Sequence, residues 1–311
     1  MKLLLSKPRG FCAGVERAIE TVEKALTIWG APIYVKHEIV HNKHVVDGLR
    51  AKGAVFIEEI NEVPIGSRLI YSAHGVSPAV RDQAKERQLI EIDATCGLVT
   101  RVHSAVKRFA DKGYQIILIG HRNHVEIIGT AGEAPSVTTI VESVKDVATL
   151  QYSPSDKLFY ITQTTLSIDD VKEITEALIV KYPHIETLPS SSICYATTNR
   201  QMALREITDI TDLVLVVGDS QSSNSNRLRE VASTRGIASY LINDESEINP
   251  EWMNGVKTIG LTAGASTPEG IVQGCIRRLI ELGVKDVEDV VFTNEDVVFQ
   301  LPKPIVMAFG R

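Results

Sequence analysis

Short apolar segments alternate with amphipathic segments along most of the chain. Five runs are apolar enough to be strands covered on both faces, as in parallel sheets. They lie at 68–72, 115–119, 157–161, 213–217 and 257–261. Residues 101–112 and 169–181 have apolar positions at helical spacing, and Thr267-Pro268-Glu269 predicts a capped helix with proline in its first turn. This alternation predicts an α/β fold with short, mostly parallel sheets.

A threefold internal repeat runs through this pattern. Cys12, Cys96 and Cys194 recur at comparable intervals, and each comes just before an amphipathic helical segment. A polar cluster follows each cysteine at a nearly constant distance, and a second one follows further on, after an apolar strand. The first clusters contain His41, His124 and Ser222, and the second contain His74 in SAHGVS, Thr164 in TQTTLS and Ser266 in TAGASTP. We interpret the repeat as three copies of one α/β unit.

The repeat also predicts how the chain is divided and where a site should form. The expected parts are a first unit at 1–95, a second at 96–193, a third at 194–282, and a tail at 283–311 that packs on the first unit. Ligands bind beyond the carboxyl ends of parallel strands. If the units meet as a pseudo-threefold trefoil, three thiols converge at the centre and six polar loops surround them.

Composition narrows the class of protein. The chain is 44% apolar, and its 33 basic and 39 acidic residues give a net charge of −6. Without a basic excess, we expect no nucleic-acid or anionic-membrane surface, and partners that are small molecules or proteins. The start MKLLLSKPRG reaches charged residues and proline before a signal-peptide core can form, and no apolar run approaches the roughly 18 residues of a membrane span. We therefore expect a cytoplasmic monomer.

The cysteines are candidates for metal ligands. Four widely spaced cysteines do not make a disulfide scaffold. Cys275 shares helical spacing with Ile271 and Leu279, which predicts a core position. The three repeated cysteines precede helices, where the dipole favours the thiolate that binds soft metals. Closed zinc and iron–sulfur sites normally have four protein ligands, and three cysteines are one short of that number. A metal with an open position can bind a substrate, which indicates a catalytic site. A [4Fe–4S] cluster with three cysteine ligands would leave one iron for a substrate oxygen.

The segments around these positions resemble the 4-hydroxy-3-methylbut-2-enyl diphosphate reductase (IspH/LytB) family. The resemblance extends from the first strand to about residue 282, and the segments occur in the family's order. They are PRGFCAGV (8–15), HEIVHN (37–42), SAHGVS (72–77), DATC (93–96), GHRNHVE (120–126), TQTTLS (162–167), ICYATTNRQ (193–201), SSNSNRL (222–228) and TAGAS (262–266).

The resemblance implies a reaction and a set of site residues. The family reduces (E)-4-hydroxy-3-methylbut-2-enyl diphosphate to isopentenyl and dimethylallyl diphosphates, the last step of the methylerythritol phosphate pathway, with electrons from a flavodoxin or ferredoxin. By resemblance, Cys12, Cys96 and Cys194 hold the [4Fe–4S] cluster, and Thr164 and Glu126 act on the allylic alcohol. The residues that it implies for the diphosphate are His41, His74, His124, Ser222, Ser223, Asn224 and Ser266.

The chemistry of these residue types agrees with those roles. A diphosphate needs many convergent donors, and histidine, serine, asparagine and helix N-termini supply them without a lysine cluster. Glu126 is the one carboxylate in the loop GHRNHVEII. A carboxyl group desolvated near an anionic substrate has a raised pKa and can donate a proton to a leaving hydroxyl. His124, two residues earlier, is placed to relay that proton or orient the carboxyl.

Two other classes of protein, a zinc peptidase and a non-catalytic cluster protein, match parts of the sequence. HEIVH at 37–41 matches the HExxH pattern of zinc peptidases, but that motif needs a helix, and APIYVKHEIVHN favours a strand followed by a loop. An electron carrier or redox sensor usually closes its cluster with four protein ligands and has no use for anion-binding loops. No GxGxxG follows the first strand, and no Walker A sequence occurs. We expect structural or solvated roles for the remaining histidines, His37, His44, His103, His121 and His184.

Two positions depart from the family pattern. Family members usually have proline after the second cluster cysteine and between the histidine and glutamate of the proton-donor loop, where this chain has Gly97 and Val125. Glycine adds backbone freedom, and valine restores an N–H that proline lacks. Neither change removes a predicted ligand or acid. The segment after about residue 283 matches only loosely, and we expect it only to pack against the first unit.

Overall fold

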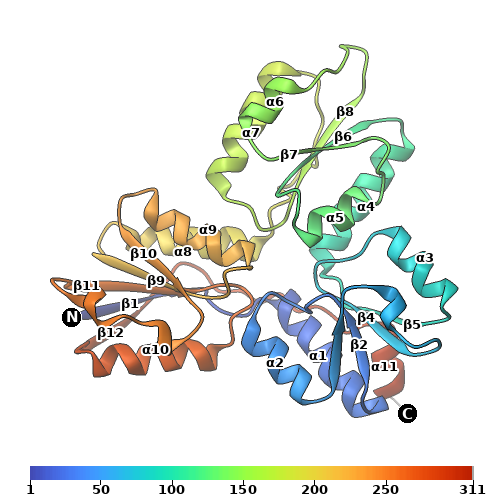
Figure 1. Cartoon of the computed structure of the whole chain (residues 1–311). Helices are drawn as coiled ribbons and strands as arrows, with labels where there is room; N and C mark the ends of the chain where they lie inside the picture. The colour runs from blue at the N-terminus through green and yellow to red at the C-terminus, as the bar shows by residue number, and fades with distance from the viewer. Residues whose placement is uncertain (310–311) are drawn as a thin grey trace. The chain divides into compact units, whose positions relative to one another are not determined.

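Three parallel β-sheets form the framework of the computed structural model, which describes residues 1–309 (Figure 1). The strands are β1 (Lys2–Lys7), β2 (Ile33–Lys36), β3 (Ala54–Ile57), β4 (Arg68–Tyr71), β5 (Ile90–Asp93), β6 (Gln115–Ile119), β7 (Thr138–Val141), β8 (Leu158–Thr162), β9 (Leu213–Val217), β10 (Ala238–Ile242), β11 (Thr258–Ala263) and β12 (Asp286–Val291). Their orders are β10-β9-β11-β1-β12, β3-β2-β4-β5 and β7-β6-β8. The predicted α/β class with short parallel sheets is confirmed.

Helices connect these strands and cover the sheets. They are α1 (Ala13–Trp29), α2 (Lys43–Ala51), α3 (Pro78–Glu86), α4 (Gly97–Asp111), α5 (Val125–Ala131), α6 (Val144–Thr149), α7 (Ile168–Lys181), α8 (Tyr195–Thr208), α9 (Ser223–Ser233), α10 (Glu269–Glu281) and α11 (Lys303–Phe309). Short 3-10 turns lie at Ile60–Glu62, Glu245–Glu247 and Pro250–Met253. None of the helices within residues 1–309 is long and apolar enough to cross a membrane.

Tight packing divides the chain into two compact units. The first, called here the five-strand unit, consists of Met1–Val15, His41–Val46 and Tyr195–Val298 and contains the five-stranded sheet. The second, the two-sheet unit, consists of Glu16–Val40, Asp47–Cys194 and the segment that begins at Phe299. Each unit is described below by itself.

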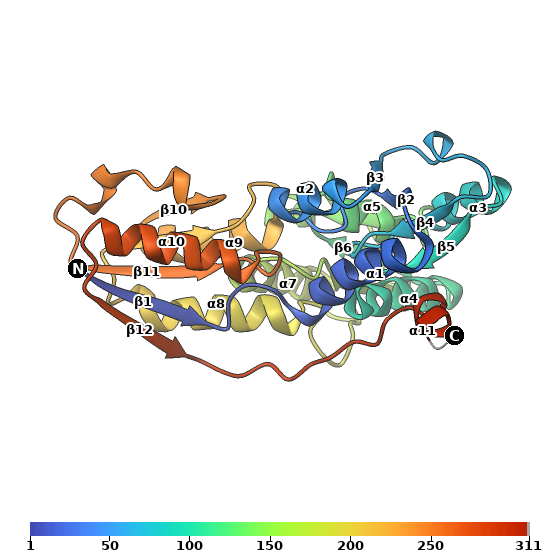
Figure 2. The same cartoon turned by 90° about the horizontal axis from the view of Figure 1, so that it is seen from below.

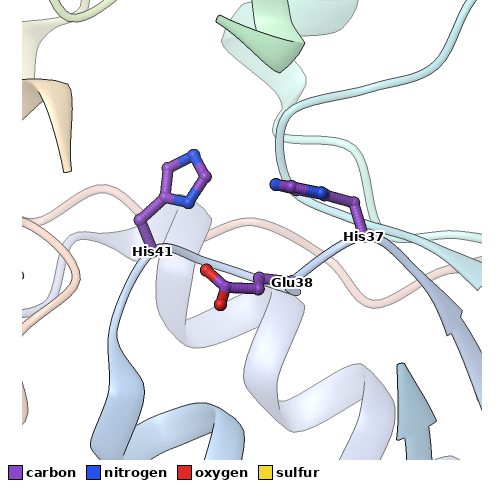
Figure 3. Close-up of side chains that lie close together, drawn as sticks. All are labelled: His37, Glu38 and His41. Carbon is purple, nitrogen blue, oxygen red and sulfur yellow. The ribbon is translucent and has the colours of Figure 1, made fainter. Parts of the chain in front are cut away.

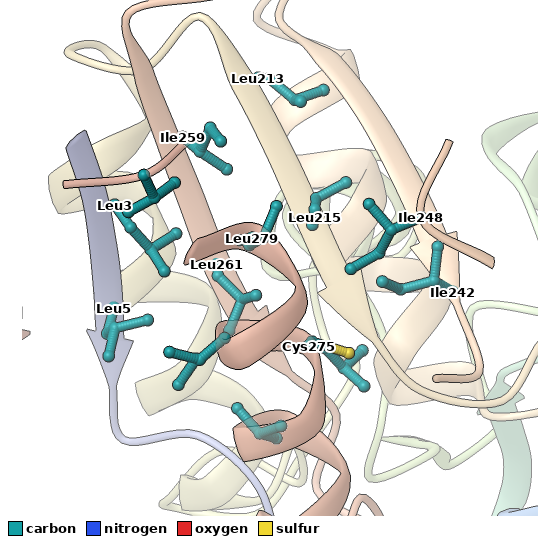
Figure 4. Close-up of a cluster of buried hydrophobic side chains, with 14 of the residues drawn as sticks. Leu3, Leu5, Leu213, Leu215, Ile242, Ile248, Ile259, Leu261, Cys275 and Leu279 are labelled. Atoms are coloured by element: carbon teal, nitrogen blue, oxygen red, sulfur yellow. The ribbon is translucent and has the colours of Figure 1, made fainter. Parts of the chain in front are cut away.

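One face of the five-stranded sheet packs against α10. Leu215 of β9 and Leu261 of β11 belong to one apolar cluster with Cys275 and Leu279 of α10 (Figure 4). Cys275 is fully buried in this cluster, as its helical spacing predicted, and burial raises the pKa of its thiol to about 12. A protonated thiol inside an apolar core is a small hydrophobic group. Cys275 is therefore a packing residue.

The other face of the same sheet packs against α8 and α9 (Figure 1 and Figure 2). Val214 and Val216, which alternate with Leu215 along β9, join a cluster with Leu204 of α8 and Leu228 of α9. Successive residues of a strand point to opposite faces, so both faces need apolar side chains. All five residues of β9 are accordingly buried. This is the doubly covered strand that the continuous apolar run predicted.

The two-sheet unit uses the same layering. In the three-stranded sheet, Leu118 packs on one face with Ile127 of α5, and Ile117 packs on the other with Leu178 of α7. In the four-stranded sheet, Leu69 of β4 belongs to a cluster with Ala84 of α3. Helices therefore pack on both sheets, and single loop residues, Val76 after β4 and Leu166 after β8, complete these cores.

The five predicted strands are confirmed as β4, β6, β8, β9 and β11, and the predicted helices as α4, α7 and α10. One detail differs. Pro268 caps α10 from outside, with ψ near 138°, and the helix starts at Glu269. The Thr267 hydroxyl donates to the carbonyl of Val217 (2.9 Å), which holds the chain extended before the first helical turn.

Strand β1 pairs with β11 and β12 rather than with the strands that follow it in the sequence. The segment grouped by sequence into 1–95 therefore contributes its first strand to the sheet built from 195–298. The tail has two parts: β12 completes that sheet, and the chain from Phe299 lies against α1, where Arg17 donates to the carbonyl of Gln300 (2.6 Å). The division at 1–95, 96–193, 194–282 and 283–311 stays a prediction.

The core of the five-strand unit yields a direct stability test. Leu215→Ala should lower the free energy of unfolding of this unit by about 2–5 kcal/mol, because it leaves a cavity between the sheet and α10. Val298 is 87% exposed, so Val298→Ala should change it by no more than about 0.5 kcal/mol. Urea titration followed by circular dichroism checks both values. Equal effects of the two substitutions would contradict the assigned core.

Candidate active site

The three repeated cysteines each lie immediately before a helix. Cys12 precedes α1, Cys96 is the N-cap of α4, and Cys194 precedes α8. All three side chains are partly exposed, in contrast to Cys275. A thiolate in this position is stabilised by the backbone N–H groups and the dipole of the helix. The predicted placement at helix starts is therefore confirmed, while the role of these residues as ligands stays a prediction.

A repeated hydrogen bond fixes each cysteine turn. The backbone N–H of every one of these cysteines donates to a carbonyl in one of the second polar clusters. The pairs are Cys12 to Ala265 (3.1 Å), Cys96 to Ala73 (3.0 Å) and Cys194 to Thr164 (3.0 Å). Cys96 and Cys194 are thus each bonded to the second polar cluster of the repeat copy before their own. Cys12, in the first copy, is bonded to the second polar cluster of the last copy. The repeat in the sequence corresponds to a repeat in the hydrogen bonding, shifted by one copy.

Arg200 supports the turn that carries Cys12. Its side chain is 1% exposed and donates to the carbonyls of Gly10 (2.8 Å) and Phe11 (3.2 Å). The Glu295 carboxylate lies 3.0 Å from the guanidinium and compensates its charge. A buried arginine is stable only with such partners. Sequence reasoning missed this residue, because nothing in NRQ indicates burial on a helix.

Arg17 supports the turn that carries Cys96 in a similar way. It donates to the carbonyls of Thr95 (2.9 Å) and Asp93 (3.3 Å). Gly97 follows, and a Cβ atom built there would lie 3.3 Å from the Phe299 ring. The glycine, found where the family usually has proline, therefore makes room for an aromatic side chain of the C-terminal segment.

Glu126 is a buried acid that is hydrogen-bonded to Thr164. Its carboxylate accepts hydrogen bonds from the Thr164 backbone N–H (2.7 Å) and hydroxyl (2.9 Å), and the residue is 2% exposed. Burial raises the pKa of Glu126 above its usual value, although the bonds from Thr164 and the nearby charge of His103 act to lower it. The carboxyl is therefore suited to hold a proton and to release it to a bound group.

His124 caps the helix that carries this acid. Its Nδ1 accepts the backbone N–H of Glu126 (3.1 Å), so in a neutral ring the proton lies on Nε2. Val125 is the first residue of α5, a position whose N–H has no acceptor within the helix and where proline is also common. Valine in place of proline therefore leaves the start of α5 and the backbone of Glu126 in place.

The histidine loops of this unit lie close together. The rings of His74 and His124 are 5.9 Å apart at 83°, and the Ser72 hydroxyl lies 3.3 Å from His74 Nδ1. Gly75 has φ +78°, and a Cβ atom there would meet the His103 ring at 3.1 Å. Only glycine adopts this turn so close to the imidazole without strain. His103 in turn pairs with Glu133 (2.8 Å).

The remaining predicted diphosphate residues lie in the five-strand unit. Ser222 caps α9, and its hydroxyl accepts from the backbone N–H (3.3 Å) and hydroxyl (3.0 Å) of Ser225. Cβ atoms on Gly218 and Gly264 would come within 2.2 and 2.0 Å of the Ser225 hydroxyl. The start of this helix therefore packs directly on the ends of β9 and β11. A helix N-terminus there favours an anion, as the sequence SSNSN predicted.

Asn224 and Ser266 link neighbouring loops in the same unit. The Asn224 side chain accepts from the Ala265 backbone N–H (2.9 Å) and donates to the Thr197 hydroxyl (3.3 Å). The Ser266 hydroxyl donates to the carbonyl of His41 (2.9 Å). Ala265 is also the residue whose carbonyl accepts from Cys12, so the cysteine turn and the polar loops form one hydrogen-bonded assembly.

The HEIVH segment does not form a zinc-peptidase helix. It follows β2 directly and continues as a loop until α2 begins at Lys43. Figure 3 shows His37, Glu38 and His41 along this loop. The predicted strand followed by a loop is confirmed. Residues 37–41 form no helix that would place both histidines on one face.

The structure sorts the predicted site residues into two sets. The five-strand unit holds Cys12, His41, Ser222, Ser223, Asn224 and Ser266, and the two-sheet unit holds His74, Cys96, His124, Glu126, Thr164 and Cys194. The diphosphate, cluster and catalytic roles of these residues stay predictions. What the structure shows is that each set lies on loops after parallel strands or at helix starts.

Comparison with known proteins identifies relatives over the whole length. The model of the family described as LytB protein matches residues 3–280. The 4-hydroxy-3-methylbut-2-enyl diphosphate reductase of Protochlamydia amoebophila is 83% identical over 308 residues, covering 99% of this chain and 98% of that protein. The reductase of the same name from Chlamydia pneumoniae is 62% identical over 306 residues, with 98% of each chain covered.

Solved structures agree with this result. The E-1-hydroxy-2-methyl-but-2-enyl-4-diphosphate reductase from Plasmodium falciparum has a TM-score of 0.97 and 48% identity, covering 100% of this chain and 98% of that one. A structure of (E)-4-hydroxy-3-methyl-but-2-enyl diphosphate reductase, described as the terminal enzyme of the non-mevalonate pathway, has a TM-score of 0.64 and 30% identity. It covers 90% of this chain and 99% of that one.

Arg200 provides a test of the support for the Cys12 turn. Arg200→Met should lower the free energy of unfolding by about 3–5 kcal/mol, because it leaves Glu295 without its buried partner. It should also speed alkylation of Cys12 in cluster-free protein, measured by mass spectrometry. Arg235→Met, on the exposed turn after α9, is the control and should change neither value. An unchanged alkylation rate in Arg200→Met would contradict the proposed support.

The raised pKa of Glu126 makes stability depend on pH. The folded chain binds this proton more tightly than the unfolded chain, so stability falls as pH rises from the ordinary glutamate pKa of about 4.3 to the raised folded value. Glu126→Gln lacks this titration. Its Tm relative to the wild type should therefore increase with pH across that window, as measured by calorimetry. Parallel Tm curves for the two proteins would show that Glu126 does not hold its proton in the folded state.

Proposed function

Because this chain belongs to the LytB protein family and is an enzyme of the same class as the reductases that match it, we propose that it reduces (E)-4-hydroxy-3-methylbut-2-enyl diphosphate. The products would be isopentenyl and dimethylallyl diphosphates, at the last step of the methylerythritol phosphate pathway. The observation that carries the proposal is the buried Glu126 carboxyl, which accepts from the backbone N–H and the hydroxyl of Thr164, since a removable hydroxyl needs a proton donor of this kind.

A [4Fe–4S] cluster held by Cys12, Cys96 and Cys194 is the proposed cofactor. The residues fit this group because all three offer a soft sulfur donor at the start of a helix, with the turn fixed by a backbone hydrogen bond. Cys275, fully buried in a core, is unsuited to be a fourth ligand. When bound, such a cluster supplies electrons one at a time and an electrophilic iron that no protein side chain occupies.

The diphosphate would be held by neutral donors and helix N-termini. In the two-sheet unit we assign this role to His74 and His124, and in the five-strand unit to His41, Ser222, Ser223, Asn224 and Ser266. Histidine Nε2–H, hydroxyl and amide groups all donate to phosphate oxygens, and the start of α9 favours negative charge. Binding the diphosphate by many donors fixes the position of the allylic alcohol at the other end of the substrate.

Glu126 and Thr164 would deliver the proton that turns the hydroxyl into a leaving water molecule. The reaction consumes two electrons and two protons: one proton leaves in water, and the other forms the new C–H bond. Protonated Glu126 can donate directly. Donation through the Thr164 hydroxyl needs that hydroxyl, which in this structure donates to the carboxylate, to turn and accept the proton. The resulting allyl unit can accept the second proton at either end, so we expect a mixture of the two products.

The electrons would come from a reduced flavodoxin or ferredoxin. We further propose that the chain works as a cytoplasmic monomer, since no described helix could span a membrane and the reaction needs no second subunit. A cluster protein without catalytic activity is the competing function. It would bind iron and sulfide equally well, but would not turn over the diphosphate substrate.

An anaerobic assay with Glu126→Gln tests the proposed function. Wild-type protein with a chemical reductant should convert the hydroxymethylbutenyl diphosphate into both products. Glu126→Gln should keep the visible absorption of the cluster and lose at least about 100-fold in turnover, because it cannot donate a proton. Glu173→Gln, on the exposed face of α7, is the matched control and should keep full activity.

Three results would contradict the proposal or one part of it. Wild-type protein with a full cluster that leaves the substrate unchanged would favour the electron-carrier function. Full activity of Glu126→Gln would remove this residue from proton donation. Bound zinc in place of iron and acid-labile sulfide would exclude the reductase function altogether.

A further inference from the structure

His37 lies outside the predicted site, yet its ring contacts one of the predicted diphosphate residues. The rings of His37 and His74 are 6.0 Å apart at 70°, and those of His74 and His124 are 5.9 Å apart at 83°. We call these three residues the histidine row. The row ends beside the buried acid, because His124 Nδ1 accepts the backbone N–H of Glu126.

Glu58 holds the outer end of the row. Its two carboxylate oxygens lie 2.9 and 3.1 Å from His37 Nδ1. Since a carboxylate only accepts hydrogen bonds, this contact places a proton on Nδ1. The Lys36 ammonium donates to the Glu58 carbonyl and lies 3.8 Å from the carboxylate, which keeps Glu58 in position. Glu58 therefore restrains the plane of the His37 ring through a contact on the solvent side, where the Glu58 side chain is 65% exposed.

The backbone at His37 is unusual. Its φ is +60°, in the left-handed region that costs a residue other than glycine about 1–2 kcal/mol. The His37 backbone N–H donates to the Ile57 carbonyl (2.8 Å), so the turn is held by the neighbouring strand β3. Conformations of this kind persist where the surrounding contacts determine them, and they cluster at functional sites. Here the turn brings the side chain of His37 next to His74.

A purely structural role does not explain this arrangement. A cavity of about 190 Å³ borders His37 and Glu58, so the pair lies beside solvent-accessible space and outside the apolar core. The same cavity borders Ser72, whose hydroxyl lies 3.3 Å from His74 Nδ1. The Ser72 hydroxyl therefore meets His74 at Nδ1, and the imidazoles of His37 and His124 both lie against its ring.

We propose that His37, fixed by Glu58, is a positioning residue that sets the ring plane of His74 and, through His74, that of His124. This role rests on the proposed function, in which His74 and His124 bind the diphosphate. In metal sites, a carboxylate often orients a histidine ligand from behind, and mutating such a carboxylate commonly lowers the affinity for the metal by about 10–100-fold. We expect an effect near the lower end, about tenfold, because His37 acts through ring contact and touches no part of the substrate.

Binding of inorganic diphosphate to the holoenzyme tests this role. In His37→Asn, asparagine tolerates the left-handed backbone but lacks the ring. Its Kd for inorganic diphosphate, measured by calorimetry under anaerobic conditions, should rise about tenfold. KM for the substrate should rise to a similar extent, with kcat nearly unchanged, because Glu126 and Thr164 are intact. His184→Asn is the matched control, an exposed histidine that lies against the Tyr182 ring and the Asp156 carbonyl, and should match the wild type.

Two further variants separate positioning from loss of folding. Glu58→Gln keeps the His37 ring but weakens its contact with residue 58. The Kd for inorganic diphosphate should therefore rise by a smaller factor than in His37→Asn. If His37→Asn does not fold, the Glu58→Gln result decides the test. In a His74→Ala background, His37→Asn should add less than about twofold, because its effect passes through His74. An unchanged Kd in folded His37→Asn, or an undiminished effect in the His74→Ala background, would overturn the inference. Wild-type protein that fails to bind diphosphate would overturn the proposed function and this role together.

Discussion

The site depends on one repeated constraint: a hydrogen bond from the backbone N–H of each cysteine to a carbonyl in a loop after a parallel strand. The bond joins two segments distant in sequence, and it fixes the backbone from which the sulfur projects. The buried Arg200 reinforces it around Cys12 by donating to the carbonyls of Gly10 and Phe11, and Gly264, next to Ala265, packs closely on Ser225. Cysteine placement is thus built into the ends of the sheets.

Burial of polar groups sets the chemistry that these loops can perform. Burial destabilises the ionised form of the Glu126 carboxyl, and the fold tolerates it because the backbone N–H and the hydroxyl of Thr164 both donate to it. Within the same unit, His124 Nδ1 accepts the backbone N–H of Glu126, and the Ser72 hydroxyl lies 3.3 Å from His74 Nδ1. In the proposed reaction, the same desolvation that costs stability would give the carboxyl a proton to donate, so the proposed role of this residue depends on the packing of the first turn of α5.

Much of the fold could be predicted because it is encoded locally. Continuous apolar runs located five strands, and helical spacing correctly placed Cys275 in the core. The sequence could not predict that β1 pairs with β11 and β12, since parallel strands of similar composition carry no label for their neighbours. It also gave no sign of the contact between His37 and His74, because such contacts depend on how separate loops pack.

The most direct test of the account is the iron and acid-labile sulfide content of anaerobically reconstituted single Cys→Ser variants. Cys12→Ser, Cys96→Ser and Cys194→Ser should each lose most of the cluster, whereas Cys275→Ser should keep the wild-type content despite its altered core. Full cluster content in any of the first three variants, or its loss in Cys275→Ser alone, would contradict the assignment of these thiols.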